Sequence, residues 1–200
     1  MPYKIFIDQG HNPMNPNAGA EYGGVREQDI TFTVGRRLYA LLSADPRFTA
    51  ELSRPEPTTQ LGTTNRESLQ ARVLAAKRFG ADFFISLHAN AAADAAVSGS
   101  EAFVYSRESR ANCLAFRILT GLHEETGLKN RGVFVRPGLY VLRNTAMPAV
   151  LVELGFLSNE HDRRLMVEEP GAFALGVYDG LLSYYGLPPV TSPFGGTAST

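Results

Sequence analysis

The stretch from Lys4 to Ile30 is the feature that most constrains the fold of this chain. A short apolar run, residues 5–7, stops at Asp8, and His11 follows in a loop rich in Gly, Asn and Pro. Glu27 then opens a segment whose apolar residues recur with helical spacing. The stretch therefore predicts a strand, a histidine at its carboxyl end and a carboxylate at the next helix start. In open α/β sheets, ligands bind beyond the carboxyl ends of the strands.

The rest of the chain continues this alternation of apolar runs and amphipathic segments. We expect further strands at residues 47–54, 82–88, 100–106 and 149–154, and short extended pieces within residues 131–143. We expect helices at residues 27–43, 66–79, 108–125, 160–167 and 173–185, with Gly80 and Asn159 as caps. The pattern predicts a single α/β domain with a mainly parallel twisted sheet, flanked by helices on both faces.

Length and composition limit the possible organisation and partners. The 200 residues suit one domain, which we place at residues 1–186, followed by a flexible, linker-like tail at residues 187–200 that is rich in Pro, Gly, Ser and Thr. A net charge of −1 without a basic block argues against nucleic-acid binding. No apolar run reaches the roughly 20 residues of a membrane span, and the first residues lack the pattern of a secretory signal.

Two later strands bring further polar groups to the expected rim of the sheet. His88 ends the strand at residues 82–88, and Glu153 lies near the end of the strand at residues 149–154. Two imidazoles and one carboxylate form a typical catalytic zinc site, in which a fourth position stays open for water or substrate. A further carboxylate that does not bind the metal is needed as general base, and burial of Glu153 would raise its pKa toward the working range.

Each of these residues also has an ordinary structural interpretation. A histidine at a strand end is commonly a satisfied polar residue, and Glu27 alone suits a first-turn acid stabilised by the helix dipole. Glu153 could form a buried salt bridge with Arg143 or Arg54. The hypothesis of a metal site therefore depends on the four residues occurring together in one chain.

Three other residues with reactive side chains are expected to lie outside the site. Cys113 is the single cysteine, so it forms no intrachain disulfide, and we expect a small buried core residue. His123 lacks the second histidine of an HExxH helix, and His161 lies in a polar segment where we expect it to be solvated.

Four segments carry a resemblance to a known family: IFIDQGHNP, NAGAEYGGVREQDI, ARVLAAKRFGADFFISLHANA and PAVLVELGFLSN. They resemble the zinc-dependent N-acetylmuramoyl-L-alanine amidases of the Amidase_3 type, a family of peptidoglycan hydrolases that includes autolysins, spore-wall amidases and phage endolysins. The resemblance covers residue 4 to about residue 185, with the motifs in the family's order. It implies that His11, Glu27 and His88 bind zinc and that Glu153 is the catalytic glutamate.

This resemblance implies hydrolysis of the amide that joins N-acetylmuramic acid to L-alanine of the stem peptide. Peptidoglycan is then the expected partner, the cell wall the place of action, and a monomer the expected state. A zinc peptidase or deacylase acting on small amides is the alternative enzyme, and a wall-binding module without catalysis is a third possibility. A nucleotide-binding domain is a weaker one, because the first loop is not G-x-G-x-x-G.

The chain departs from the family pattern at two places. Asn12–Pro13 follows the first histidine where many members have Gly-Gly, and the segment Arg72…Ala76–Lys77 lacks the asparagine of the family's Arg…Ala-Asn segment. Both departures leave the predicted ligands in place. We expect them to affect the shape of the first loop or the fit of the substrate.

Overall fold

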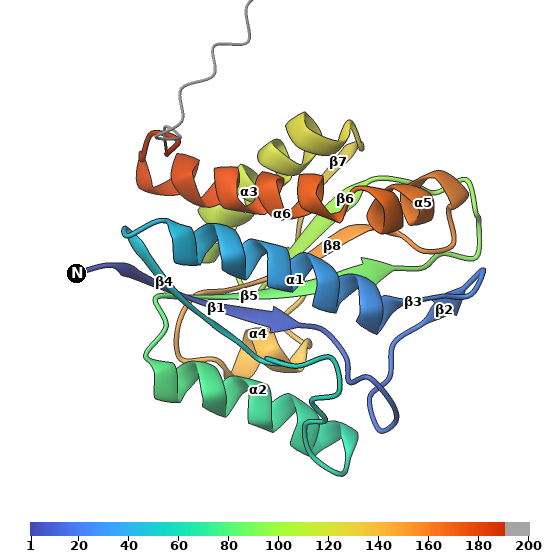
Figure 1. The fold of residues 1–200 in the computed structure, drawn as a ribbon, viewed down its shortest axis with the longest axis horizontal. Helices are drawn as coiled ribbons and strands as arrows, with labels where there is room; N and C mark the ends of the chain where they lie inside the picture. The colour runs from blue at the N-terminus through green and yellow to red at the C-terminus, as the bar shows by residue number, and fades with distance from the viewer. Residues whose placement is uncertain (191–200) are drawn as a thin grey trace, which may run out of the picture.

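The computed structural model describes residues 1–190, so residues 191–200 of the predicted tail lie outside the described residues. Within residues 1–190 the main sheet has six strands in the order β4-β1-β5-β8-β6-β7 (Figure 1). These strands are β1 (Tyr3–Gln9), β4 (Phe48–Leu52), β5 (Phe83–Asn90), β6 (Ser100–Val104), β7 (Asn130–Val135) and β8 (Ala149–Phe156). A small antiparallel hairpin, β2 (Glu21–Tyr22) with β3 (Val25–Arg26), precedes the first helix.

The sheet is mainly parallel, as the sequence predicts. β4, β1, β5 and β8 all run in the same direction, whereas β6 pairs antiparallel with β8 and parallel with β7. The central strands β1 and β5 are apolar on both faces because helices cover both sides of them. The carboxyl ends of four strands therefore meet at one rim, and the amino-terminal ends of β6 and β7 reach the same rim.

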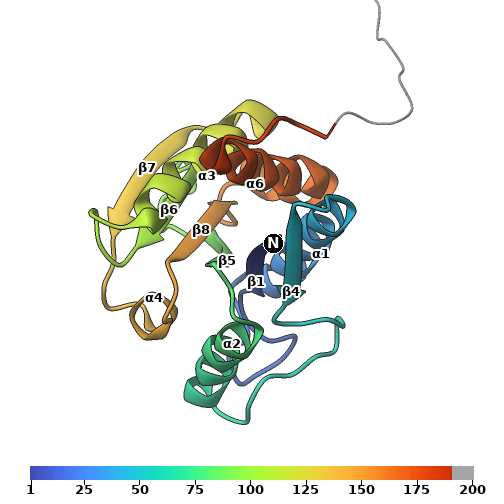
Figure 2. The same cartoon turned by 90° about the vertical axis from the view of Figure 1, so that its left-hand side faces the viewer.

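Helices cover both faces of the sheet, and the sheet separates two apolar cores (Figure 2). One face carries α1 (Glu27–Ala44), α3 (Arg110–Thr126) and α6 (Pro170–Tyr185), and the other carries α2 (Asn65–Phe79) and α4 (Tyr140–Asn144). Successive side chains along a strand point to opposite faces of the sheet and so enter different cores. Phe83 faces the first core and Phe84 the second. The remaining helix, α5 (Glu160–Glu168), lies between β8 and α6 in the chain. No helix in the described part combines the length and apolarity required to cross a membrane.

The predicted caps are confirmed, and two other expectations are wrong. Gly80 ends α2 with a left-handed backbone (φ 70°), and the Asn159 side chain accepts a hydrogen bond from the amide of Asp162 at the start of α5. Residues 140–144 form a helix rather than an extended piece, because Val141 and the residue after it pack into the second core. Cys113 is exposed rather than buried, because α3 turns its neighbour Leu114 toward the core instead.

Glycines bring α3 and α6 into close contact. A Cβ atom added to Gly176 would lie 2.7 Å from the Cα of Leu122, and one added to Gly180 would lie 2.5 Å from the Cα of Ile118. Gly121, on the facing side of α3, meets the carbonyl oxygen of Gly176 in the same way. The two helices can cross at this distance only because these positions lack side chains.

We predict that Gly176→Ala destabilises the fold by about 1–3 kcal/mol, because the added methyl group meets backbone that cannot move aside, and this outweighs the gain in helix propensity. Thermal or urea unfolding measures the effect. Gly171→Ala is the matched control on the same helix, since its Cβ would lie 3.6 Å from Nη1 of Arg37, an ordinary contact. Equal stability of the two variants would contradict the prediction.

Candidate metal centre

Three of the predicted site residues converge at the rim of the sheet. His11 follows β1, His88 lies near the end of β5, and Glu27 is the first residue of α1. Nε2 of His11 lies 3.1 Å from Oε2 of Glu27, and Nδ1 of His88 lies 2.9 Å from Oε1 of the same carboxylate. One donor atom from each residue lies within 4.8 Å of the other two. The three side chains are therefore able to hold one metal ion.

The Glu27 carboxylate is buried and hydrogen-bonded on both oxygens. The amide of Ala20 donates to Oε2 (3.2 Å) and the amide of Ala89 donates to Oε1 (3.1 Å). Burial on its own would raise the pKa of Glu27, but the hydrogen bonds from His11 and His88 outweigh it and hold the pKa below its ordinary value. The carboxylate is consequently ionised, as metal binding requires.

Glycines allow the chain to approach these side chains closely. A Cβ atom on Gly10 would lie 2.5 Å from Cε1 of His88, and one on Gly19 would lie 2.8 Å from Oε2 of Glu27. His11 itself has a left-handed backbone (φ 68°), which is uncommon for a residue other than glycine. Such strained backbone is concentrated at functional sites, where the surrounding contacts hold it in place.

A buried ion pair between Arg72 and Asp8 holds the backbone of the His11 loop in place. Nη1 of Arg72 lies 2.6 Å from Oδ1 of Asp8 and donates to the carbonyl of Gln9, while Nη2 donates to the carbonyl of His11. Burial would raise the pKa of Asp8, but the charge of Arg72 and a hydrogen bond from Ser86 lower it overall. From the sequence, Arg72 stands out only as part of the family's motif. Its contacts with Asp8 and the His11 loop depend on the fold and cannot be predicted from the sequence.

The departure at Asn12 has a structural role in the same loop. Its side-chain amide donates to the carbonyls of Pro16 and Leu61 at 2.8 and 2.9 Å, and its Oδ1 accepts from Arg72 and from the amide of Leu61. Ser68 on α2 adds a longer hydrogen bond of 3.4 Å. Asn12 therefore closes the loop on itself and ties it to α2.

Glu153 lies beside this group on the neighbouring strand. It is in register with His88 on β5 and with Glu101 on β6, so the three side chains form a row on one face of the sheet. Burial, and then the negative charges of Glu27 and Glu101, raise the pKa of Glu153 well above its ordinary value. Its Oε2 is shielded from solvent and has no hydrogen-bond partner.

The salt bridge that Glu153 could form with Arg143 or Arg54 is absent from residues 1–190. Arg54 instead donates to the carbonyl of Gln28 at 2.6 Å, and the ion pairs in this part of the chain do not include Arg143. The ordinary structural interpretation of Glu153 is therefore wrong. A carboxyl group whose Oε2 is buried without a cationic partner favours a role in proton transfer.

Sequence reasoning did not identify Glu101, which extends the row beyond Glu153. Its Oε2 lies 2.9 Å from Nε of Arg131 on β7, and its Oε1 accepts from the side-chain amide of Asn90 at 2.9 Å. Arg131 is thereby paired with Glu101 rather than with Glu153. No periodicity marks this pairing, since it follows from the register of β6 between its two neighbours.

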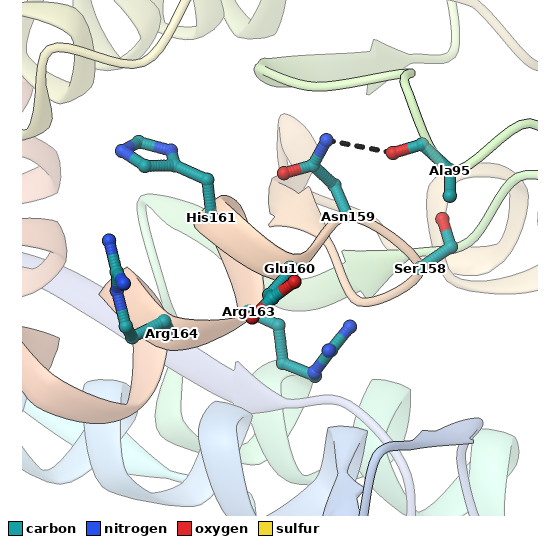
Figure 3. Close-up of a pocket in the computed structure, with 7 residues that line it drawn as sticks. All are labelled: Ala95, Ser158, Asn159, Glu160, His161, Arg163 and Arg164. Atoms are coloured by element: carbon teal, nitrogen blue, oxygen red, sulfur yellow. Dashed lines mark hydrogen bonds between the residues drawn. The ribbon is translucent and has the colours of Figure 1, made fainter.

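Two cavities differ in their relation to this centre. One of about 180 Å³ lies between α2 and α4, directly beside His11 and His88, and its apolar wall includes Leu69, Leu139 and Leu151. Another of about 570 Å³ lies at the start of α5, and residues 158–161 contribute to its lining together with Ala95 and two arginines (Figure 3). None of the residues that line the second cavity belongs to the metal-binding group.

The two remaining histidines lie outside the centre, as predicted. His161 is exposed on α5, with its ring at the cavity of Figure 3. His123 lies in the last turn of α3, and its Nδ1 is 2.8 Å from the carbonyl oxygen of Leu128. Neither imidazole contributes a donor atom to the group formed by His11, Glu27 and His88.

The fold and the donor set define an α/β domain with a candidate metal centre at the carboxyl rim of its sheet. The Amidase_3 family model, described as N-acetylmuramoyl-L-alanine amidase, matches residues 5–183. The chain therefore belongs to the Amidase_3 family, as its motifs predict.

Relatives and solved structures agree with this assignment. The chain is 33% identical over 187 residues to the N-acetylmuramoyl-L-alanine amidase LytC of Bacillus subtilis (90% of this chain, 35% of LytC), so it spans about a third of that relative. It is 29% identical to the germination-specific amidase of the same species (92% of this chain, 82% of the relative). The catalytic domain of the amidase CwlV from Bacillus (Paenibacillus) polymyxa superposes with a TM-score of 0.81 at 27% identity, covering 93% of this chain and 99% of that domain.

We predict that Arg72→Met lowers the affinity for zinc by about 10–100-fold, because the loop that carries His11 loses its support and Asp8 loses its counter-charge. Competition with a chromogenic chelator measures the affinity, and circular dichroism reports whether the variant is folded. Arg78→Met, on the exposed side of α2, is the matched control and should bind zinc normally. An unchanged affinity in Arg72→Met would show that Arg72 does not position the ligand.

Proposed function

We propose that this chain hydrolyses the amide between N-acetylmuramic acid and L-alanine of the peptidoglycan stem peptide. The observation that carries this proposal is the convergence of His11, Glu27 and His88 beside the unpaired carboxyl group of Glu153. Membership of the Amidase_3 family and the likeness to named amidases support the choice of substrate.

Zinc fits the donor set better than a hard cation does. Two imidazole nitrogens and a single carboxylate suit zinc, whereas Mg²⁺ and Ca²⁺ prefer oxygen ligands throughout. Three protein ligands also leave a coordination position for water or substrate. When bound, zinc polarises a carbonyl group and lowers the pKa of a bound water from 15.7 to about 7. His11, Glu27 and His88 are the residues that would hold it.

Glu27 and Glu153 would have different roles because their surroundings differ. Hydrogen bonds keep Glu27 ionised and suited to a metal, whereas burial and nearby negative charge raise the pKa of Glu153 toward the range in which it exchanges protons. Glu153 would take a proton from the attacking water and then deliver it to the departing amine of L-alanine.

The proposal includes the organisation of the chain. Residues 1–186 would be the catalytic domain, and residues 187–200 would be a linker. The enzyme would act as a monomer on the cell wall. The chain spans only about a third of LytC. The proposal therefore extends to the activity of a longer protein, if this chain is one domain of such a protein.

Digestion of purified peptidoglycan followed by mass spectrometry tests the reaction directly. The expected product is a free stem peptide with alanine at its amino terminus, together with glycan strands that retain the lactyl group. Cleavage of small amides without release of such peptides would favour a zinc peptidase or deacylase instead.

We predict that Glu153→Gln lowers the rate of stem-peptide release by about 10²–10⁴-fold, because glutamine cannot accept the proton of the attacking water. Metal analysis should find the same zinc content as in the unsubstituted enzyme, since Glu153 is outside the ligand set. Glu168→Gln, an exposed position on α5, is the control and should keep full activity. Full activity of Glu153→Gln would refute the role assigned to Glu153.

A further prediction concerns removal of the metal. Incubation with a strong chelator should abolish the clearing of a suspension of cell walls, and added zinc should restore it, because the three ligands would coordinate the metal reversibly. Turbidity measures the clearing, and the chelator saturated with zinc beforehand is the control. Clearing that persists after the metal has been removed would overturn the zinc mechanism.

A further inference from the structure

We infer that the face of β6 and β7 next to Glu153 binds a sugar ring of the glycan strand, an inference that rests on the proposed function. The surface consists of Phe103, Phe134 and Arg136, and we call it the aromatic shelf. It lies on the same face of the sheet as His88 and Glu153, at the edge farthest from β4.

The register of the strands places the aromatic shelf beside the row that contains Glu153. Phe103 on β6 is in register with Leu151 on β8 and with Phe134 on β7. Leu151 precedes Glu153 by two residues, so both side chains point to the same face, and Leu151 also lines the cavity beside His11. With strands about 4.8 Å apart, β7 lies roughly 10 Å from β8, a distance that suits a sugar joined to the scissile amide by a lactyl group.

The aromatic shelf is left partly open by the helices on this face. α4 packs against β8 and α2, and Phe134 remains 38% exposed. The opposite face of the same strands is buried, since Ala102 and Val104 belong to the first core. Single exposed apolar residues are normal on protein surfaces, so the position of Phe134 on the face that carries Glu153, and not its exposure alone, points to a ligand.

The composition of the aromatic shelf matches the chemistry of a pyranose ring. The rings of Phe103 and Phe134 lie 6.4 Å apart at an angle of 55°, and the guanidinium of Arg136 lies 5.4 Å from the centre of the Phe103 ring. A pyranose has an apolar face of C–H groups and a rim of oxygen atoms. The exposed Phe134 ring can pack against that face, while Arg136, which lies over the Phe103 ring, offers hydrogen-bond donors for hydroxyl and acetamido oxygens.

The other surface beside the metal centre is less suited to a sugar. The cavity between α2 and α4 measures about 180 Å³, and its walls are mainly apolar, although Asn17 and Arg72 also line it. Such a narrow apolar space suits a small side chain, whereas the aromatic shelf is open along the edge of the sheet. The glycan is therefore assigned to β6 and β7 and the peptide to the opposite side of Glu153.

Binding of glycan strands that lack stem peptides tests this assignment. The zinc-loaded enzyme is titrated with purified strands of alternating N-acetylglucosamine and N-acetylmuramic acid, and calorimetry or NMR gives the dissociation constant. We expect Phe134→Ala to weaken binding by about threefold to tenfold and Phe134→Tyr to retain it, because the ring is what packs against the sugar. Phe116→Ala, which changes an exposed phenylalanine on α3 (52% exposed), is the control and should bind normally.

Unchanged binding in Phe134→Ala, or an unsubstituted enzyme that does not bind these strands, would overturn the inference. Thermal unfolding of each variant shows whether its fold is intact. The proposed function is judged separately by release of stem peptides from whole peptidoglycan. An enzyme that releases the peptides but binds bare glycan equally well with and without Phe134 keeps its proposed function and loses this sugar site.

Discussion

The carboxylate of Glu27 is the interaction on which the centre depends. It contacts imidazoles at the ends of β1 and β5, and it accepts backbone hydrogen bonds from Ala20 and Ala89. Three segments that are distant in sequence thus meet at two oxygen atoms. A buried anion without such partners would cost several kcal/mol, so the same contacts that prepare Glu27 for a cation also close the loop between β1 and α1 over the sheet.

The pair of Asp8 and Arg72 gives this arrangement its rigidity. Both side chains are almost fully buried, and the guanidinium also donates to the backbone on each side of Gly10. A buried ion pair adds little net stability by comparison with apolar packing, but loss of one partner leaves an isolated charge and is costly. We therefore interpret the pair as a device that specifies one conformation of the loop, including the left-handed backbone of His11.

The sequence predicts much of this architecture, and the failures have identifiable physical causes. The strands and longer helices are predicted because their apolar spacing is regular, and His11 and His88 are placed at one rim because parallel strands must end together. The helix at residues 140–144 is too short to show a helical period, and the exposure of Cys113 depends on how α3 is rotated against α6. The contacts of Asn12 and Arg72 arise only from tertiary packing.

Glu101 illustrates a different limit, which follows from strand direction. A search for polar residues just after each apolar run finds the side chains at the carboxyl ends of parallel strands. Such a search misses residues at the start of a strand that runs the other way. β6 runs antiparallel to β8, so its first residues, not its last, lie at the rim beside Glu153. Because β7 is parallel to β6, its start brings Arg131 to the same place. The reversed direction of β6 and β7 thus adds a paired acid and base to the rim. This pairing leaves Glu153 free of a cation and extends the face of the site outward to the edge of the sheet.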